Sequence, residues 1–148
     1  MKISPKLPTL LLAALLTPSL GAQTPAEQAV LAPITAMFDG MTERDAAAIQ
    51  KPTLPGGTMV LMRDGKPTQV TFAAFAERVA KPSKVKIEEK INHPLIRVDN
   101  DLAMVWAPFV FLSDGKVNHC GTDLFNLVRV DGKWLIASVA DTGKNDCP

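Results

Sequence analysis

The first periodic run of apolar residues in the chain has the spacing of an amphipathic helix. One face of it collects residues three or four positions apart, namely Val30, Ile34, Met37, Phe38 and Met41. A capping box with proline at the first helical position fits the residues just before this run, which are Thr24, Pro25 and Glu27. We expect a helix that begins at Pro25, bends or becomes regular only after Pro33, and ends at Gly40.

The elements predicted next are short. They are a helix over 42–49, a loop over 53–57, strands over 58–62 and 69–71 around a turn at 63–66, and a helix over 72–79. Pro52 is expected to stop the first of these helices and Pro82 the second, because proline and the residue before it disfavour helical backbone.

The second half of the chain has the pattern of a strand meander. Its predicted strands cover 84–93, 95–98, 102–112, 117–130 and 133–142. The turns between them contain Asp99-Asn100-Asp101 and the Asp-Gly pairs at 114–115 and 131–132, and Asp-Gly is a strong hairpin signal. His93-Pro94 is expected to bend the first strand, since proline cannot donate to a strand ladder. Helices followed by a mostly antiparallel sheet indicate an α+β fold.

Residues 1–22 have the composition of a secretory signal peptide. Lys2 and Lys6 precede an apolar stretch of about ten residues, and small residues lead to Ala22, after which we expect cleavage. The stretch is shorter than the roughly 20 apolar residues of a membrane span. The alternatives are an N-terminal anchor and a buried helix. We expect an exported protein, periplasmic or secreted, whose single domain covers residues 23–148.

Charge and motifs exclude several classes of function. Removal of Lys2 and Lys6 leaves 14 basic against 15 acidic residues, so no basic surface for a nucleic acid is expected. The sequence after residue 22 contains no second long apolar run, so we expect no membrane segment after cleavage. The sequence contains no GxSxG, phosphate-loop or HExxH motif, and we expect no cofactor.

Cys120 and Cys147 are the two cysteines of the chain. In an exported protein such a pair indicates a disulfide. The alternative is two free thiols. A metal site is disfavoured because neither cysteine has a second ligand at CxxC or CxxH spacing, although His119 precedes Cys120.

Four strings in the second half, 96–103, 106–111, 119–128 and 131–136, resemble the nuclear transport factor 2-like superfamily. The similarity is strongest to small exported members related to the SnoaL and ketosteroid isomerase groups, sometimes labelled lumazine-binding-like. The resemblance implies a strongly bent sheet wrapped around helices, a cone with an apolar cavity. That cavity binds a small molecule in some members, catalyses acid–base chemistry in others and is filled in many. Homodimers through the open face of the sheet are common in the superfamily.

The turns predict which side chains share a face of the sheet. Two-residue Asp-Gly loops and a pairing of Val98 with Asp101 place four residues in one row across the strands: His93, Trp106, Asp123 and Ala140. We assign this face to the concave side because it is the more aromatic one. A one-residue slip at any turn would exchange the two faces.

This assignment yields the candidate site. Asp123 and His93 are the candidate catalytic pair, because a carboxylate desolvated in an apolar cavity has the raised pKa of a general acid or base. The candidate ligand-binding residues are Phe38, Met104, Trp106, His119, Phe125 and Ser138. The alternative is that Asp123 pairs with His93 or with backbone donors and serves only the core. The other, also apolar, face is expected to be covered by a partner subunit.

Three functions fit these predictions. The first is binding of a small apolar or aromatic molecule without catalysis. The second is an isomerase, cyclase or dehydratase that uses Asp123 and His93 for proton transfer. The third is a homodimerising accessory module. The enzyme hypothesis requires a pocket of at least roughly 300 Å3 with Asp123 at its wall and unpaired by a cation. Closure of the cavity by Phe38, Met41 and Phe75 would exclude it.

Overall fold

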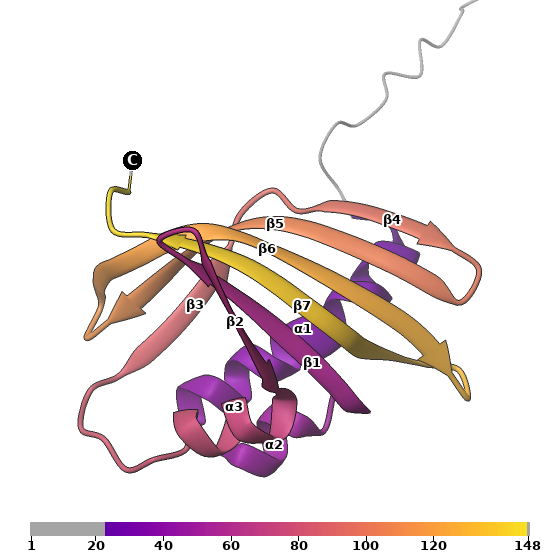
Figure 1. The fold of residues 1–148 in the computed structure, drawn as a ribbon. Helices are drawn as coiled ribbons and strands as arrows, with labels where there is room; N and C mark the ends of the chain where they lie inside the picture. Colours follow the sequence, from indigo (N-terminus) through magenta and orange to yellow (C-terminus); the bar gives the residue numbers. More distant parts are fainter. Residues whose placement is uncertain (1–22, 148) are drawn as a thin grey trace, which may run out of the picture.

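Seven strands form one curved sheet whose concave side is covered by three helices in the computed structural model, which describes residues 23–147 (Figure 1). The predicted signal peptide lies outside the described residues. The elements in chain order are α1 Pro25–Glu43, α2 Ala46–Gln50, β1 Thr53–Arg63, β2 Lys66–Thr71, α3 Phe72–Val79, β3 Ile87–Ile91, β4 Leu95–Asp99, β5 Leu102–Ser113, β6 Lys116–Val130 and β7 Lys133–Lys144.

The strand order of the sheet is β2-β1-β7-β6-β5-β3, and β4 also pairs with β5. All pairs are antiparallel except β1 with β7, which run parallel. The single parallel pair joins the first strand of the chain to the last, so the sheet is mixed. The predicted α+β cone, with helices inside a bent sheet, is confirmed.

The start of α1 is the predicted capping box. The Thr24 hydroxyl accepts a hydrogen bond from the Glu27 amide at 3.2 Å, and the Glu27 carboxylate accepts one from the Thr24 amide at 2.8 Å. The predicted end at Gly40 is wrong, because the helix continues to Glu43 and is capped by Arg44 in the left-handed region. A Cβ atom on Gly40 would lie 2.7 Å from the amide nitrogen of Ile49, so this glycine permits close packing of α2 rather than ending α1.

Two boundaries after α1 also differ from the prediction. The second helix begins after Asp45, whose carboxylate accepts hydrogen bonds from the amides of Ala47 and Ala48, and not at Thr42. Residues 53–57 are not a loop but the first part of β1, beside β7, with an irregular register before Thr58.

The predicted Asp-Gly turns are present, and the register beside them is as expected. Asp114 and Asp131 have positive φ angles, as do the glycines after them, which is the geometry of tight two-residue hairpins. Ser113 pairs with Lys116, and Val130 with Lys133.

Farther from these turns, two bulges displace the strands by one residue. Asn118 in β6 has no partner in β5, and Ala137 in β7 has no partner in β6. Asp123 therefore lies opposite Ala107 and Asp141, and the predicted row that joined Asp123 to Trp106 and Ala140 is wrong. A bulge places two residues of one strand opposite a single residue of the neighbouring strand. Beyond the bulge, each residue therefore pairs with a residue that the prediction placed on the other face.

The core lies between the concave face and the helices. Phe125, Leu127 and Ile136 are fully buried there, and the ring of Phe38 in α1 meets that of Phe125 edge-on with centroids 6.1 Å apart. Burial of each such side chain stabilises the fold by about 1.5–3 kcal/mol. This packing anchors α1 across the sheet and sets the position of the residues that α1 contributes to the site.

A disulfide joins Cys120 in β6 to Cys147, with 5.8 Å between the Cα atoms. It ties the C-terminal segment after β7 to the neighbouring strand. Within residues 23–147, no helix is both long and apolar enough to cross a membrane.

Candidate functional site

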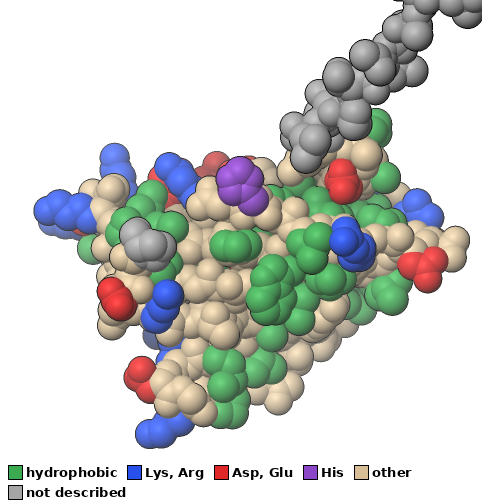
Figure 2. Space-filling view, turned by 90° about the horizontal axis from the view of Figure 1, so that it is seen from above, with side chains coloured by type: hydrophobic (Ala, Val, Ile, Leu, Met, Phe, Trp, Pro, Cys, Tyr) green, Lys and Arg blue, Asp and Glu red, His purple; other side chains and the backbone are tan. Residues whose placement is uncertain are grey.

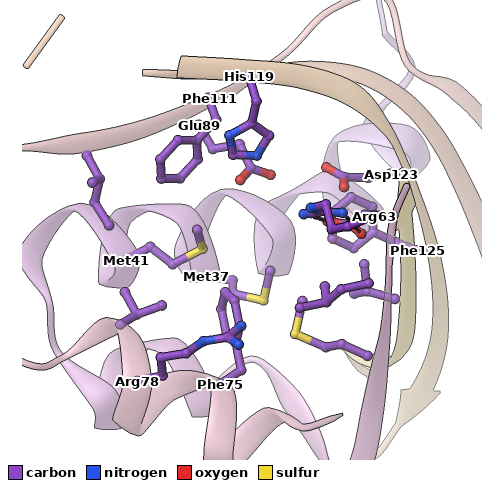
Figure 3. Close-up of a pocket in the computed structure, with 16 residues that line it drawn as sticks. Met37, Met41, Arg63, Phe75, Arg78, Glu89, Phe111, His119, Asp123 and Phe125 are labelled. Carbon is purple, nitrogen blue, oxygen red and sulfur yellow. Dashed lines mark hydrogen bonds and ion pairs between the residues drawn. The ribbon is translucent and has the colours of Figure 1, made fainter. Parts of the chain in front are cut away.

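A cavity of about 190 Å3 lies between the helices and the concave face of the sheet (Figure 3). Its walls differ in character. The helices supply mostly apolar side chains, including Met37 and Met41 from α1 and Phe75 from α3. The sheet supplies most of the polar ones, which are Arg63, Glu89, His119, Asp123 and Asp141, and α3 adds Arg78. A ligand in this cavity would therefore meet a mostly apolar surface on the helical side and most of the titratable groups on the sheet side.

Asp123 is the most deeply buried of these polar residues, with 3% of its surface exposed. It lies in the middle of β6, two positions before Phe125, so the alternation of the strand turns both side chains inward. Its Oδ2 atom has no hydrogen-bond partner. Burial raises the pKa of Asp123 to about 10, and the neighbouring Glu89 carboxyl contributes to the increase. At neutral pH, Asp123 is therefore a neutral acid that can donate a hydrogen bond.

Glu89 projects from β3 into the same cavity. It is flanked by Ile87 and Ile91 at alternate positions, so it occupies the inward face of a short edge strand. Burial raises the pKa of Glu89 to about 7. Figure 3 shows the carboxyl groups of Glu89 and Asp123 turned toward the cavity. No cation is paired with either of them among the ion pairs of residues 23–147.

Asp141, the cross-strand neighbour of Asp123 on β7, has different partners. Its two carboxylate oxygens accept hydrogen bonds from Nη1 and Nη2 of Arg63 at 2.6 and 2.7 Å. The amide of Met62 donates a third at 3.2 Å. This bidentate hydrogen bond raises the pKa of Arg63 further. A Cβ atom on Gly143 would lie 2.7 Å from Nε of Arg63, so the glycine leaves room for the guanidinium to fold over β7.

His119 closes the wall beside Glu89. Its ring stacks on Phe111, with centroids 4.8 Å apart and planes 24° apart, and meets Phe109 edge-on at 5.6 Å. Burial, with a smaller effect of the Arg63 charge, lowers the pKa of His119. The ring is therefore neutral at pH 7 and is fixed by aromatic contacts.

The structure brings together only part of the predicted set. Asp123, His119 and Phe125 line the cavity, and Phe38 is buried behind Phe125. Met104, Trp106 and Ser138 do not line it: they lie on the outer face, because the bulges at Asn118 and Ala137 shift them past the predicted row. Their placement in the cavity was wrong.

His93 is also misplaced by the prediction. It is exposed between β3 and β4 with a φ angle of 44°, and Pro94 follows it. The expected bend at this position is present, but the bend removes His93 from the sheet and from Asp123. Glu89 occupies the position beside Asp123 that the prediction gave to His93.

The sequence analysis missed four polar residues that line the cavity, which are Arg63, Arg78, Glu89 and Asp141. Arg63 falls at the end of β1 rather than in the predicted turn. Asp141 lies inside β7, within the strand predicted over 133–142, but was not assigned to the site. Glu89 had a usable signal, since a carboxylate between Ile87 and Ile91 interrupts an inward apolar face. Arg63 and Asp141 are brought together by the parallel pairing of β1 with β7, which no local pattern indicates.

The cavity meets one requirement of the enzyme hypothesis and misses another. Asp123 lies at its wall without a cation, as required. The volume is below roughly 300 Å3, and drug-sized ligands occupy roughly 300–1,000 Å3. Met41 and Phe75 line the cavity but do not fill it. Residues 23–147 contain no cluster of His, Cys, Asp or Glu suited to a metal ion. The arrangement can bind a small organic molecule and exchange a proton with it.

The outer face of the sheet carries an apolar surface. Trp106 and Leu95 are cross-strand neighbours there, 48% and 44% exposed, and Leu102 at the end of β5 is 57% exposed. Figure 2 shows hydrophobic side chains gathered over this face, with charged residues mainly around its edge. Exposed apolar side chains grouped in this way are typical of an interaction surface.

The curved sheet around helices, with a polar group at the bottom of its cavity, defines a nuclear transport factor 2-like fold. Three solved structures illustrate the likeness. A nuclear transport factor 2-like protein of unknown function from Shewanella baltica is 18% identical, with a TM-score of 0.64 over 84% of this chain and 100% of that one. One from Pseudomonas putida is 13% identical, with a TM-score of 0.66 over 82% and 89%. A cystatin-like-fold protein of unknown function from Nostoc punctiforme is 8% identical, with a TM-score of 0.68 over 84% and 96%.

Residues 25–140 match the family model described as "Putative lumazine-binding", and the chain belongs to that family. No curated protein matches the chain. The predicted membership of the nuclear transport factor 2-like superfamily is confirmed, and the match covers nearly all of the described residues.

Proposed function

We propose that this protein binds one small, largely apolar or aromatic molecule in the concave cavity and does not convert it. The observation that carries the proposal is the unpartnered Oδ2 atom of Asp123 at the wall of a cavity whose helical side is mostly apolar. A buried polar atom without a partner costs about 1–3 kcal/mol, which a ligand with one suitably placed polar group would offset.

The shape and polarity of the cavity support a small, flat ligand. A ring would contact Met37, Met41 and Phe75 on the helical side, and its polar edge would face Asp123 and Glu89 on the sheet side. The cavity volume of about 190 Å3 suits one ring or two fused rings better than a larger molecule. The family description agrees with this size, because lumazine is a flat, fused two-ring compound with polar atoms on its edge.

The direct test is to extract small molecules from the protein after purification from its native compartment and to identify them by mass spectrometry. Val139→Phe would fill the cavity from β7, and Trp106→Phe on the outer face is the matched control. We expect a compound that accompanies wild type and Trp106→Phe but is lost from Val139→Phe. Met59→Phe, another cavity substitution, replaces Val139→Phe if that variant does not fold. Equal recovery from all folded variants would contradict the proposal.

Proton-transfer catalysis is the second candidate, and the raised pKa of Asp123 favours it. Asp123 would give or take the proton, and Glu89 would be the second carboxyl in place of His93. In D2O, an isomerase would introduce deuterium into a C–H position of the extracted compound, and Asp123→Asn would abolish this exchange. A binding protein would leave the compound unlabelled, and Asp123→Asn would retain the compound.

Two further properties belong to this proposal. We propose that the protein forms a homodimer through the outer face around Trp106, supported by the apolar surface there. We also propose export after cleavage near residue 22, supported by the disulfide between Cys120 and Cys147.

A further inference from the structure

We propose that the ligand of the cavity is a small organic monocation, a protonated amine or amidine on an aromatic ring, whose N–H groups are bound by the carboxyls of Asp123 and Glu89. This inference rests on the proposed function and specifies its ligand. It follows from the balance of charge inside the cavity, from the unpartnered oxygen of Asp123 and from the aromatic walls.

The charge balance must include every titratable group that faces the cavity. These are Arg63 on β1, Arg78 on α3, Glu89 on β3, His119 and Asp123 on β6, and Asp141 on β7, while α1 contributes methionines. Both terminal nitrogens of Arg63 are bound by Asp141. His119 is neutral at pH 7, since burial lowers its pKa.

Arg78 does not neutralise the acidic pair. Its side chain is exposed at the rim, and its guanidinium lies 5.5 Å from the ring centroid of Phe75. Figure 3 shows Arg78 and Phe75 on the opposite side of the cavity from Glu89 and Asp123. In the described part of the chain, the inner carboxyls that have no cation beside them are therefore those of Asp123 and Glu89.

The pair carries about half a negative charge at pH 7 and close to one at pH 8. Burial raises the pKa of both carboxyls, to about 10 for Asp123 and about 7 for Glu89, so Asp123 retains a proton while Glu89 loses its own. One bound positive charge then neutralises the site. An anion would be repelled by Glu89, and a neutral molecule would leave the Glu89 charge with its hydrogen bond to the protonated Asp123 but without a counter-charge.

The Oδ2 atom of Asp123 supplies the second, independent observation. Asp123 is 97% buried, so this oxygen has little access to bulk water, and no protein donor reaches it. Loss of a hydrogen-bond partner at a buried carboxyl is costly, and an N–H group of the ligand would supply the missing donor.

Aromatic side chains around the pair favour the same class of ligand. Phe111 lies beside Glu89 across β5 and β3, and Phe125 follows Asp123 on β6. The face of an aromatic ring attracts an organic cation by about 0.5–2 kcal/mol, more strongly where water is excluded. The cavity thus combines ring faces with a single negative charge.

The test compares benzylammonium with benzyl alcohol, which has nearly the same shape but no charge, by calorimetric titration at pH 5.5 and pH 8. We expect benzylammonium to bind at least about tenfold more tightly than benzyl alcohol at pH 8 and to lose most of that advantage at pH 5.5, where Glu89 is protonated. Benzylammonium remains protonated at both pH values. In Glu89→Gln/Asp123→Asn the preference should disappear, while the affinity for benzyl alcohol changes less than about threefold.

Two single substitutions test the position of the proton. Asp123→Asn imitates the neutral acid, so this variant should keep the preference for benzylammonium, whereas Glu89→Gln should lose it at pH 8.

Benzyl alcohol bound as tightly as benzylammonium, or more tightly, would overturn the inference and leave the proposed function intact. If neither compound bound wild type, and the extraction experiment also recovered no compound, both the inference and the proposed function would be rejected.

Discussion

Asp123 and Asp141 are direct cross-strand neighbours on β6 and β7, yet Arg63 forms an ion pair with Asp141 only. The two carboxyls therefore have different roles although they share the concave face. Asp141 is fully hydrogen-bonded and fixes Arg63 against the sheet. Asp123 remains without a counter-charge, and this is the property on which the proposed ligand binding depends.

The first prediction concerns the stability of the fold as a function of pH. Burial raises the pKa of Asp123 from 3.8 to about 10, so the folded state binds one more proton than the unfolded state between these values. The free energy of unfolding therefore falls with rising pH, by up to about 1.4 kcal/mol per pH unit from this residue. Urea denaturation at pH 5, 7 and 9 measures the change.

Asp123→Asn is the matched comparison for that measurement, because the amide cannot titrate. The variant should gain stability relative to wild type as the pH rises. The difference between the two proteins reports on Asp123 and on the Glu89 carboxyl that interacts with it, and it cancels the contribution of more distant titrating groups. A difference that stays constant from pH 5 to pH 9 would show that Asp123 ionises in the folded state much as it does in the unfolded chain.

The second prediction concerns the ion pair between Arg63 and Asp141. Arg63→Ala removes two short hydrogen bonds from a carboxylate that is nearly buried, and we expect a loss of about 1–3 kcal/mol of stability, reduced by the partial exposure of Arg63. The control is Lys90→Ala, which removes the exposed pair with Glu88 and should cost less than about 0.5 kcal/mol. Equal losses in the two variants, measured by urea denaturation, would argue against a structural role for Arg63.

The third prediction concerns the disulfide. The bridge between Cys120 and Cys147 spans 27 residues and should contribute about 3–4 kcal/mol in the chain-entropy model. Dithiothreitol should therefore lower the Tm by at least about 5 °C, measured by circular dichroism. The double variant Cys120→Ser/Cys147→Ser should already have the lower Tm and not respond to dithiothreitol. Two thiols titratable in the unreduced, unfolded protein would exclude the bridge.

The fourth prediction concerns the outer face. Trp106→Glu places a charge in the apolar surface and should convert a dimer into a monomer in light scattering after size-exclusion chromatography. Val85→Glu is the control, because Val85 is similarly exposed but precedes β3 and lies outside the sheet. A wild-type protein that is monomeric at high micromolar concentration would exclude the proposed dimer.

Local patterns were sufficient to predict most of the fold. The capping box at Thr24 and the tight turns at Asp114 and Asp131 depend on a few adjacent residues, and each lies where it was predicted. Gly40 was misread as the end of a helix because the close approach of α2 that requires a glycine is a tertiary contact.

The candidate site was less predictable, because one extra residue in a strand exchanges its faces. Neither Asn118 nor Ala137 has a side chain that marks a bulge, yet these two residues move Trp106 and Ser138 to the outer face. Asp123 was assigned to the concave face because that face was the more aromatic one, and the alternation of β6 places Phe125 on the same face. Arg63 could not be found at all, since its place depends on the parallel pairing of β1 with β7.

The most direct test of ligand binding in the cavity is a titration of methyl-labelled methionines, followed by NMR, with small aromatic compounds including benzylammonium. Met37, Met41 and Met59 line the cavity, whereas Met104 lies on the outer face and serves as an internal control. We predict saturable shifts of the three cavity methyl signals, little change at Met104, and loss of these shifts in Val139→Phe. Shifts confined to Met104, or cavity shifts that persist unchanged in the filled variant, would contradict binding in the cavity.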